Sequence, residues 1–345
     1  MRHGKVPAVA AVAALLVCGT VACALARTDA GDTPQTGPPE LRVSRLALGT
    51  LVELVVRDPD ATRARTAIEA GFAEIERLEE LLSEWRDTSE LSRLDAAPPG
   101  GWVALSPETA DALRAALRIG AASGGAFDPT VLPLVRLWGF AGGPNRVPSD
   151  REIAATLSRV GLDQVEIDAR APRARRLHDG VELGLGGIGK GFIADRVLAL
   201  LRAAGVPAAM VAASGDFAFF GGTTLRPWPL GLEDPDRPGE GMAELALLSG
   251  ALSTSAATHR FFESGGRRYH HILDPRTGRP AEGVKSVTVV AEAATETDAF
   301  ATAIFVMGAA GPAFVSAHPE LRAVIVLEDG SRFVSPGLDV RWVAP

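Results

Sequence analysis

The chain has 345 residues, of which 47% are hydrophobic and 22% are charged. This ordinary globular balance supplies ample apolar material for a large core, and the length corresponds to one or two domains. The formal net charge of −7 argues against non-specific binding to nucleic acid, whose phosphates require a basic surface.

The first 26 residues have the pattern of a targeting segment. Arg2 and Lys5 form a short basic start, residues 6–25 are almost wholly apolar, and residues 24–26 (ALA) resemble a cleavage site. Cleavage there would lower the net charge from −7 to −9 and remove both cysteines, so the mature chain would hold no disulfide and no cysteine ligand. Lipidation at Cys23 and an uncleaved membrane anchor are the two alternatives, and all three imply export. We expect a polar, Pro-rich linker over residues 27–40 and one folded domain over 41–345.

The first half of the domain is expected to contain a strand pair and then several helices. Residues 42–56 read as a strand pair or one long bent strand, in which Gly49 permits a bulge or a close approach by a ligand. Ser106 and Pro107 have the chemistry of a helix N-cap and first turn. The helices are expected over residues 58 to about 85, 89–94, and 107 to about 123.

The rest of the chain mixes short strands with helices. Residues 126–140 are too apolar for a surface loop, and their two prolines prevent a single helix. Beyond them we expect helices at 149–160, 192–204 and 312–317, and strands at 164–168, 175–177, 207–213, 323–327 and 332–334, with further short strands up to 254. This mixture predicts a mixed α/β or α+β enzyme.

Residues 267–308 predict a strand, a turn, a second strand and a helix in succession. The expected strands cover 269–273 and 284–291, and a helix from 295 to 307 would have Thr297 as its N-cap. Asp298 and Thr302 are four residues apart and therefore share a helix face, where their oxygens suit a hard cation such as Mg²⁺. His271, on the first strand, could reach the same pocket. Each residue also has a structural alternative: stabilisation by the helix dipole, a bond to the helix backbone, or a half-buried histidine.

Residues 184–191 combine five glycines with Lys190 at the expected start of a helix. Such a segment can present backbone N–H groups and a positive charge to phosphate. It is not a P-loop, because Gly191 stands where Ser or Thr is required. The spacing of Gly184, Gly186 and Gly189 matches a dinucleotide fingerprint only weakly, with residues 181–183 as its strand and no acidic residue at the required distance. A tight strand–helix turn remains the alternative.

Eight blocks of the chain occur in a familiar order: LGT (48–50), SELSRL (89–94), GGAFDPTVLPLVRLWGF (124–140), LGGIGKGFIAD (185–195), SGDF (214–217), ALSTSA (251–256), YHHILDPRTGRP (269–280) and TDAFATAIFVMG (297–308). Together they resemble the ApbE family of exported FAD:protein FMN transferases. The resemblance implies a two-lobed α+β fold with mixed sheets, flanking helices and an FAD groove between the lobes. It also implies Mg²⁺-dependent transfer of FMN from FAD to a Thr (or Ser) hydroxyl of an exported target protein, with release of AMP.

The resemblance also implies roles for individual residues. His271 would be the general base, and the cation would be held by Asp298, Thr302 and the carbonyl of Gly187. Lys190 would lie beside the phosphates and Trp85 would stack on a ring of FAD. The rest of the FAD groove would be lined by Leu48, Gly125, Ala126, Phe127 and Ile272.

The chain departs from the family pattern at Gly184, where an Asp is usual and would bind the cofactor. Glu182, two residues earlier, is a candidate to compensate. Ser214, Ala256 and Gly189 also replace the usual residues. Two other functions stay open: an FAD pyrophosphatase that yields FMN and AMP, and a non-catalytic flavin-binding lipoprotein.

Overall fold

The computed structural model describes residues 37–343. The expected targeting segment, and residues 27–36 of the expected linker, lie outside this range. The first strand, β1 (Glu40–Ala47), already includes the last residue of the expected linker.

An eight-stranded sheet forms the centre of the fold, in the order β1-β2-β6-β7-β10-β15-β16-β17. Its other strands are β2 (Thr50–Arg57), β6 (Ala208–Ala213), β7 (Asp216–Phe220), β10 (Gly250–Ala256), β15 (Val284–Ala291), β16 (Arg322–Leu327) and β17 (Arg332–Val334). The expected segment 42–56 is thus a strand pair, and Leu48 and Gly49 make its turn. Every pairing between these neighbours is antiparallel, so the fold is α+β as expected, but the expectation of mixed sheets is wrong for this sheet.

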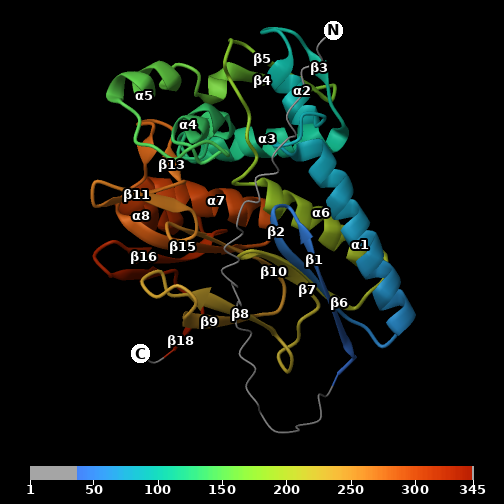
Figure 1. Ribbon diagram of the computed structural model, residues 1–345. Helices are drawn as coiled ribbons and strands as arrows, with labels where there is room; N and C mark the ends of the chain where they lie inside the picture. Colours follow the sequence, from blue (N-terminus) through green and yellow to red (C-terminus); the bar gives the residue numbers. More distant parts are fainter. Residues whose placement is uncertain (1–36, 344–345) are drawn as a thin grey trace, which may run out of the picture.

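Helices cover one face of this sheet, and a small sheet covers the other (Figure 1). The helical layer is formed by α6 (Gly189–Ala203) and α7 (Ala294–Met307), with α1 (Ala61–Leu82) lying along α6. The opposite layer is the sheet β18-β9-β8, from β8 (Trp228–Glu233), β9 (Gly241–Leu247) and β18 (Arg341–Trp342). Because β15 is covered on both faces, its sequence is a nearly continuous β-branched run rather than an alternating pattern.

A second lobe lies above the helical layer in Figure 1. It contains four helices: α2 (Glu90–Ala96), α3 (Pro107–Ala122), α4 (Leu132–Leu137) and α5 (Asp150–Leu157). Its small sheet has the order β3-β5-β4, from β3 (Val103–Ala104), β4 (Val165–Ile167) and β5 (Arg173–Arg176). Ser106 caps α3 and Pro107 begins it, as predicted. The apolar segment 126–140 is split by its prolines into a 3₁₀ turn (Pro129–Val131) and α4.

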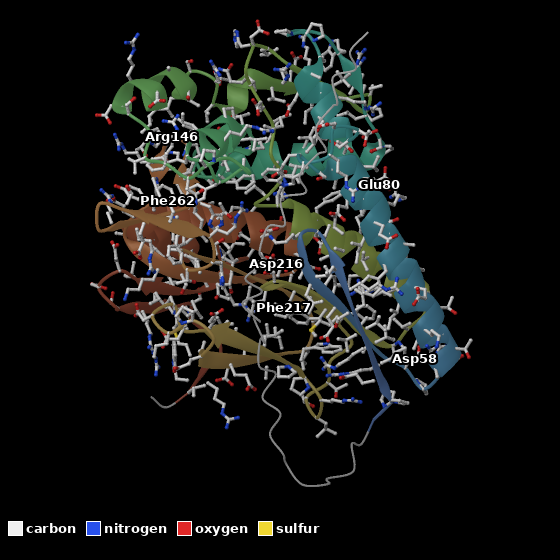
Figure 2. The ribbon with its side chains drawn as sticks, viewed as in Figure 1. Asp58, Glu80, Arg146, Asp216, Phe217 and Phe262 are labelled. Atoms are coloured by element: carbon white, nitrogen blue, oxygen red, sulfur yellow. The ribbon has the colours of Figure 1, made fainter. Side chains whose placement is uncertain are left out.

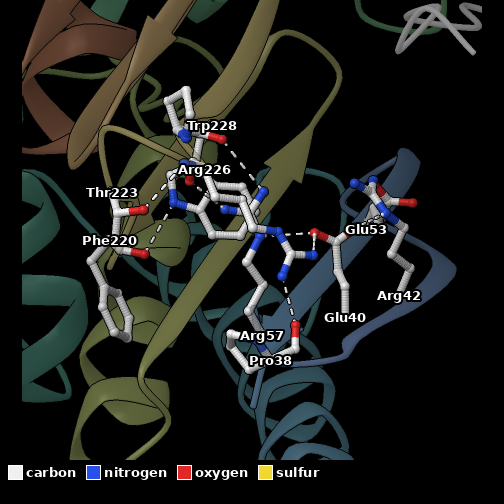
Figure 3. Close-up of polar contacts among 10 residues, drawn as sticks. Pro38, Glu40, Arg42, Glu53, Arg57, Phe220, Thr223, Arg226 and Trp228 are labelled. Atoms are coloured by element: carbon white, nitrogen blue, oxygen red, sulfur yellow. Dashed lines mark hydrogen bonds and ion pairs between the residues drawn. The ribbon is translucent and has the colours of Figure 1, made fainter. Parts of the chain in front are cut away.

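Polar contacts around Arg57 join the central sheet to the β8–β9 layer (Figure 3). The Arg57 guanidinium lies 3.6 Å from the ring centre of Trp228 and donates to Glu40 Oε2 at 2.8 Å. The Trp228 indole N–H donates to the carbonyl of Phe220 at 3.1 Å. These contacts connect β1 to a strand almost 190 residues later in the chain.

Several local predictions are wrong in ways that matter for the site. Residues 181–183 form no strand, and α6 begins at Gly189 rather than at Phe192. The expected strand 269–273 is divided into β12 (Arg267–His270) and β13 (Leu273–Asp274), so His271 lies between two strands rather than on one.

The apolar run from α7 through α8 (Gly311–Ala317) has the length and hydropathy of a membrane span, but more than half of its most apolar window is buried inside the fold.

Candidate functional site

One cavity of about 660 Å³ opens between the two lobes. Its walls come from the β1–β2 turn, the segment after α1, the segment before α4, the glycine segment before α6, the connection after β12, and α7. The sequence-predicted residues that line it are Leu48, Trp85, Ala126, Phe127, Gly184, Gly187, Lys190, His271, Ile272, Asp298 and Thr302. Gly125 does not line this cavity; it borders a neighbouring pocket of about 540 Å³ that shares Asp128 and Pro275 with it.

The glycine segment reaches α6 without a regular strand, because carboxylates from the α1–α2 region bind its backbone. The N–H of Leu183 donates to Asp95, and the N–H of Leu185 donates to Glu84 at 3.0 Å. Burial raises the pKa of Asp95 to about 7, despite the N–H of Leu183. These side-chain acceptors replace strand partners, which is why the β prediction for residues 181–183 fails.

Gly191 allows α6 and α7 to touch. A Cβ at this position would lie 2.1 Å from the carbonyl oxygen of Ala294 and 2.9 Å from the Cβ of Asp298. The Gly191 N–H donates to Asp298 Oδ2 at 3.0 Å. The glycine that breaks the P-loop pattern is therefore required by close helix packing, and it orients the carboxylate of Asp298.

Lys190 sits between two carboxylates at the cavity wall. Its Nζ lies 2.9 Å from Asp216 Oδ2 and 3.8 Å from Asp298 Oδ1. Burial alone would lower the pKa of Lys190, but the two carboxylates raise it, so the lysine stays charged. Burial raises the pKa of Asp298, the nearby Asp216 adds to this, and Lys190 opposes it. Figure 2 places Asp216 in the middle of the molecule, whereas Glu80 on α1 points outward.

Asp298 and Thr302 share one face of α7, as predicted. A Cβ on Gly187 would lie 3.2 Å from Thr302 Oγ1, so the backbone of the glycine segment passes directly beside the threonine. The Thr302 hydroxyl is 3.3 Å from Ser255 Oγ, on β10. Side-chain oxygens and a backbone stretch therefore converge from three elements.

The start of α7 is capped differently from the prediction. Thr297 lies inside the first turn, where its hydroxyl meets the Ala294 carbonyl and Ser253, and the N-cap residue Ala293 has no side-chain bond. Asp195 of α6 takes the capping role: it accepts the N–H groups of Ala294 and Thr295, each at 2.8 Å, and the Thr295 hydroxyl at 2.6 Å. The predicted cap at Thr297 is wrong because a carboxylate from a neighbouring helix satisfies the free N–H groups.

His271 and His270 face different surroundings. His271 lines the cavity, and its Nδ1 lies 3.2 Å from the carbonyl of Arg260. A carbonyl only accepts, so the proton sits on Nδ1 and Nε2 carries the free lone pair. Burial, together with the Arg260 charge, lowers the pKa of His271 to about 3. His270 is buried against Phe305, and its Nε2 lies 2.9 Å from the Ala281 carbonyl.

Three residues that line the cavity carry no sequence signal for a role there: Asp216, Glu84 and Arg260. Asp216 belongs to the recognised SGDF block, and Glu84 directly precedes Trp85, so both lie next to residues that were singled out. No spacing pattern connects Asp216 with Lys190, or Glu84 with the glycine segment, because the partners are distant in the chain. Glu182, the candidate to compensate for Gly184, instead pairs with Arg136 at 2.5 Å and does not line the cavity.

The fold and the cavity define a class: an α+β protein with a deep site that combines an oxygen-rich helix face with a lysine-bearing glycine segment. Comparison with known proteins identifies the family. A model of the ApbE family matches residues 48–325. The chain is 30% identical over 339 residues to the FAD:protein FMN transferase of Salmonella typhimurium, covering 95% of each, and 33% identical over 325 residues to that of Treponema pallidum, covering 87% of this chain and 90% of that protein.

Solved structures agree with the sequence comparisons. The ApbE protein of Thermotoga maritima superposes with a TM-score of 0.81 at 37% identity, covering 86% of this chain and 97% of that one. The flavin transferase ApbE of Vibrio cholerae gives a TM-score of 0.78 at 28% identity, covering 86% and 97%. The chain belongs to the ApbE family.

Proposed function

We infer that this chain is an FAD:protein FMN transferase. The observation that carries the inference is the convergence, in one cavity, of the Asp298–Thr302 face, the glycine segment with Lys190, and His271. In the reaction, the hydroxyl oxygen of a Thr (or Ser) on a target protein bonds to the phosphorus of the FMN half of FAD. The bond from that phosphorus to the bridging oxygen breaks, AMP leaves with that oxygen, and the hydroxyl proton passes to His271.

The geometry around His271 suits it as the base. With its Nδ1–H directed at the Arg260 carbonyl, Nε2 is free to accept a proton from a hydroxyl that enters the cavity. The low pKa keeps the imidazole neutral at neutral pH, so it is ready to accept. The same low pKa limits its basicity before substrate enters, and the negative charge of a bound pyrophosphate would raise it.

We propose that FAD occupies this cavity with its pyrophosphate at the glycine segment. Trp85, which is 53% exposed, offers a broad face for one ring, and the buried Phe127 adds an apolar surface to the cavity wall. Lys190 supplies a fixed positive charge for the phosphates, and Leu48 and Ile272 add apolar contacts. Gly125 borders the neighbouring pocket, so its part in FAD binding stays a prediction.

The residues fit a Mg²⁺ ion whose coordination would be completed by oxygens of the substrate. Asp298 and Thr302 offer oxygens beside the Gly187 backbone, but the described residues contain no cluster of three or more His, Cys, Asp or Glu that could form a cage. Mg²⁺ is commonly held by one or two carboxylates together with phosphate oxygens, which is what this site can offer. A cation bound there supplies positive charge to the pyrophosphate and the departing AMP.

We further propose that the reaction takes place outside the cytoplasmic membrane, on an exported target. This rests on the pattern of residues 1–26, which lie outside the described part of the chain. Cleavage, lipidation at Cys23 and retention as an anchor would all lead to the same compartment.

A transfer assay tests the function. The 27–345 chain is mixed with FAD, Mg²⁺ and a domain carrying an Asp-x-x-(Ser/Thr)-Ala-Thr-like segment, and a covalent flavin is sought on the target. We expect a fluorescent target band that is lost in Asp298→Ala but kept in Glu296→Ala, a half-exposed acidic residue on the same helix. AMP release that needs no target would indicate a pyrophosphatase instead, and FAD binding without turnover would indicate a non-catalytic flavin carrier.

A further inference from the structure

A carboxylate inside the cavity has no part in the reaction described above. Glu84 follows α1 and directly precedes Trp85, and it lines the cavity. Its Oε2 accepts the N–H of Leu185 at 3.0 Å, and among the described residues it forms no ion pair within 4.0 Å. Burial raises its pKa, and the N–H of Leu185 opposes this. Glu84 is only partly buried, but a partly buried carboxylate without a cation is still stabilised by each hydrogen bond that its oxygens receive.

The second oxygen of Glu84 faces the glycines. Oε1 lies 3.3 Å from the place of a Cβ on Gly186 and 3.7 Å from that of a Cβ on Gly184. The nearest atom to a Cβ on Gly184 would be the Leu132 Cβ at 3.4 Å, an ordinary contact, and Gly184 has no positive φ. Position 184 therefore has room for a side chain, but a carboxylate there would start in contact with the carboxylate of Glu84.

The neighbouring residues indicate what Oε1 would meet. Trp85 lines the same cavity, and a ring stacked on it would have its edge near the groups beside the tryptophan. Both rings of FAD carry N–H donors at their edges: the imide of the isoalloxazine and the amino group of adenine. A carboxylate oxygen accepts such a donor well, and one oxygen of Glu84 is already held in place by Leu185.

We propose that Glu84 is an FAD-binding residue that provides, from the end of α1, the carboxylate absent at Gly184, and that its Oε1 accepts an N–H from a ring of the bound dinucleotide. This rests on the proposed function in that FAD is the ligand. The carboxylate that binds the ring can then come either from residue 84 or from residue 184, which lie in the same part of the cavity. A chain needs only one of the two.

Glu84→Gln separates this role from a structural one. The amide oxygen can still accept the Leu185 N–H, which keeps the glycine segment in place, but an NH₂ donor replaces Oε1. A purely structural role predicts unchanged FAD binding. The proposal predicts that the Kd for FAD rises about 10-fold or more. The charged acceptor Oε1 is lost, and the new amide NH₂ faces the N–H of the FAD ring, so two donors oppose each other.

A double-mutant cycle tests the shared position. Binding of FAD is measured by calorimetry for the wild-type chain, Glu84→Ala, Gly184→Asp and the double variant, without a target protein, and thermal unfolding checks that each is folded. We expect weaker binding in Glu84→Ala, no improvement in Gly184→Asp, where two carboxylates adjoin, and recovery to within about threefold of wild type in the double variant. FMN and ADP, used as separate ligands, tell which half of FAD depends on Glu84.

The outcomes separate the two proposals. Tight FAD binding by wild type with equal binding by Glu84→Gln would overturn the role of Glu84 and leave the transferase function intact. A folded double variant that binds no better than Glu84→Ala would also overturn it. If the wild-type chain binds no FAD at all, the proposed function and the role of Glu84 both fail.

Discussion

Replacing Gly191 with alanine should damage the site through a single methyl group. The new Cβ would lie 2.1 Å from the Ala294 carbonyl oxygen, whereas a close C···O contact is about 3.3 Å, so α6 and α7 must separate by about 1 Å. Overpacking of this kind costs about 1–3 kcal/mol, and the better helix propensity of alanine returns at most about 1 kcal/mol. We expect a net loss of about 1–2 kcal/mol in the free energy of unfolding.

The same shift should slow the reaction more than it harms folding. It moves the Gly191 N–H away from Asp298 Oδ2 and changes the position of that carboxylate relative to Gly187. A misplacement of about 1 Å can cost about 100-fold in rate. The assays are urea unfolding, and the rate of flavin transfer as a function of Mg²⁺ concentration.

Gly189→Ala is the matched control. It lies in the same turn of α6, but a Cβ there would meet only the Leu185 Cβ at 3.6 Å, an ordinary contact. We expect this variant to be as stable as wild type or up to about 1 kcal/mol more stable, with transfer activity kept. If Gly191→Ala matched Gly189→Ala in both stability and Mg²⁺ dependence, the requirement for close packing between α6 and α7 would be refuted.

Two further predictions concern His271 and Asp195. The pKa of His271 is about 3 in the fold against 6.5 for an ordinary histidine, because burial and the Arg260 charge, with smaller contributions from His270 and Lys190, disfavour its protonation. The free energy of unfolding should therefore fall as pH drops from 6.5 towards 3, and this residue should contribute up to about 1.4 kcal/mol per pH unit. Urea unfolding at pH 7 and pH 5 should show a smaller fall in the His271→Gln variant than in wild type. Equal falls in the two proteins would contradict the assignment. Asp195→Ala should lower the free energy of unfolding, measured by thermal unfolding, by about 1–2 kcal/mol, because two N–H groups at the start of α7 lose their acceptor. It should also raise the Mg²⁺ concentration needed for transfer. Glu296→Ala in the same turn should change stability by less than about 0.5 kcal/mol, and an Asp195 variant as mild as this control would show that the cap is not needed.

The elements with strong local signals were predicted well from the sequence. The helix from Ser106 and Pro107 begins where its capping chemistry predicts, and β15 matches the predicted strand 284–291. Asp298 and Thr302 share a helix face because residues four apart always do so. The order of eight blocks identified the family, which the comparisons confirm.

Predictions failed where a distant side chain took over a local role. Thr297 has the chemistry of an N-cap, but the carboxylate of Asp195 accepts the free N–H groups at the start of α7. Residues 181–183 look like a strand, but Asp95 and Glu84 bind the backbone on either side of Gly184. His271 fits a strand pattern, yet it falls in the break between β12 and β13.

The sequence by itself indicated most of the predicted residues that line the cavity and most of the helical and extended stretches, because these depend on side-chain type and on periodicity within a few residues. Only the tertiary structure decided which of these residues meet. Lys190 faces Asp216, and Glu84 rather than Glu182 lies beside Gly184, because α1, α6 and the central sheet pack against one another. Such contacts join residues up to 100 positions apart, and no local pattern encodes a distance across a packed core.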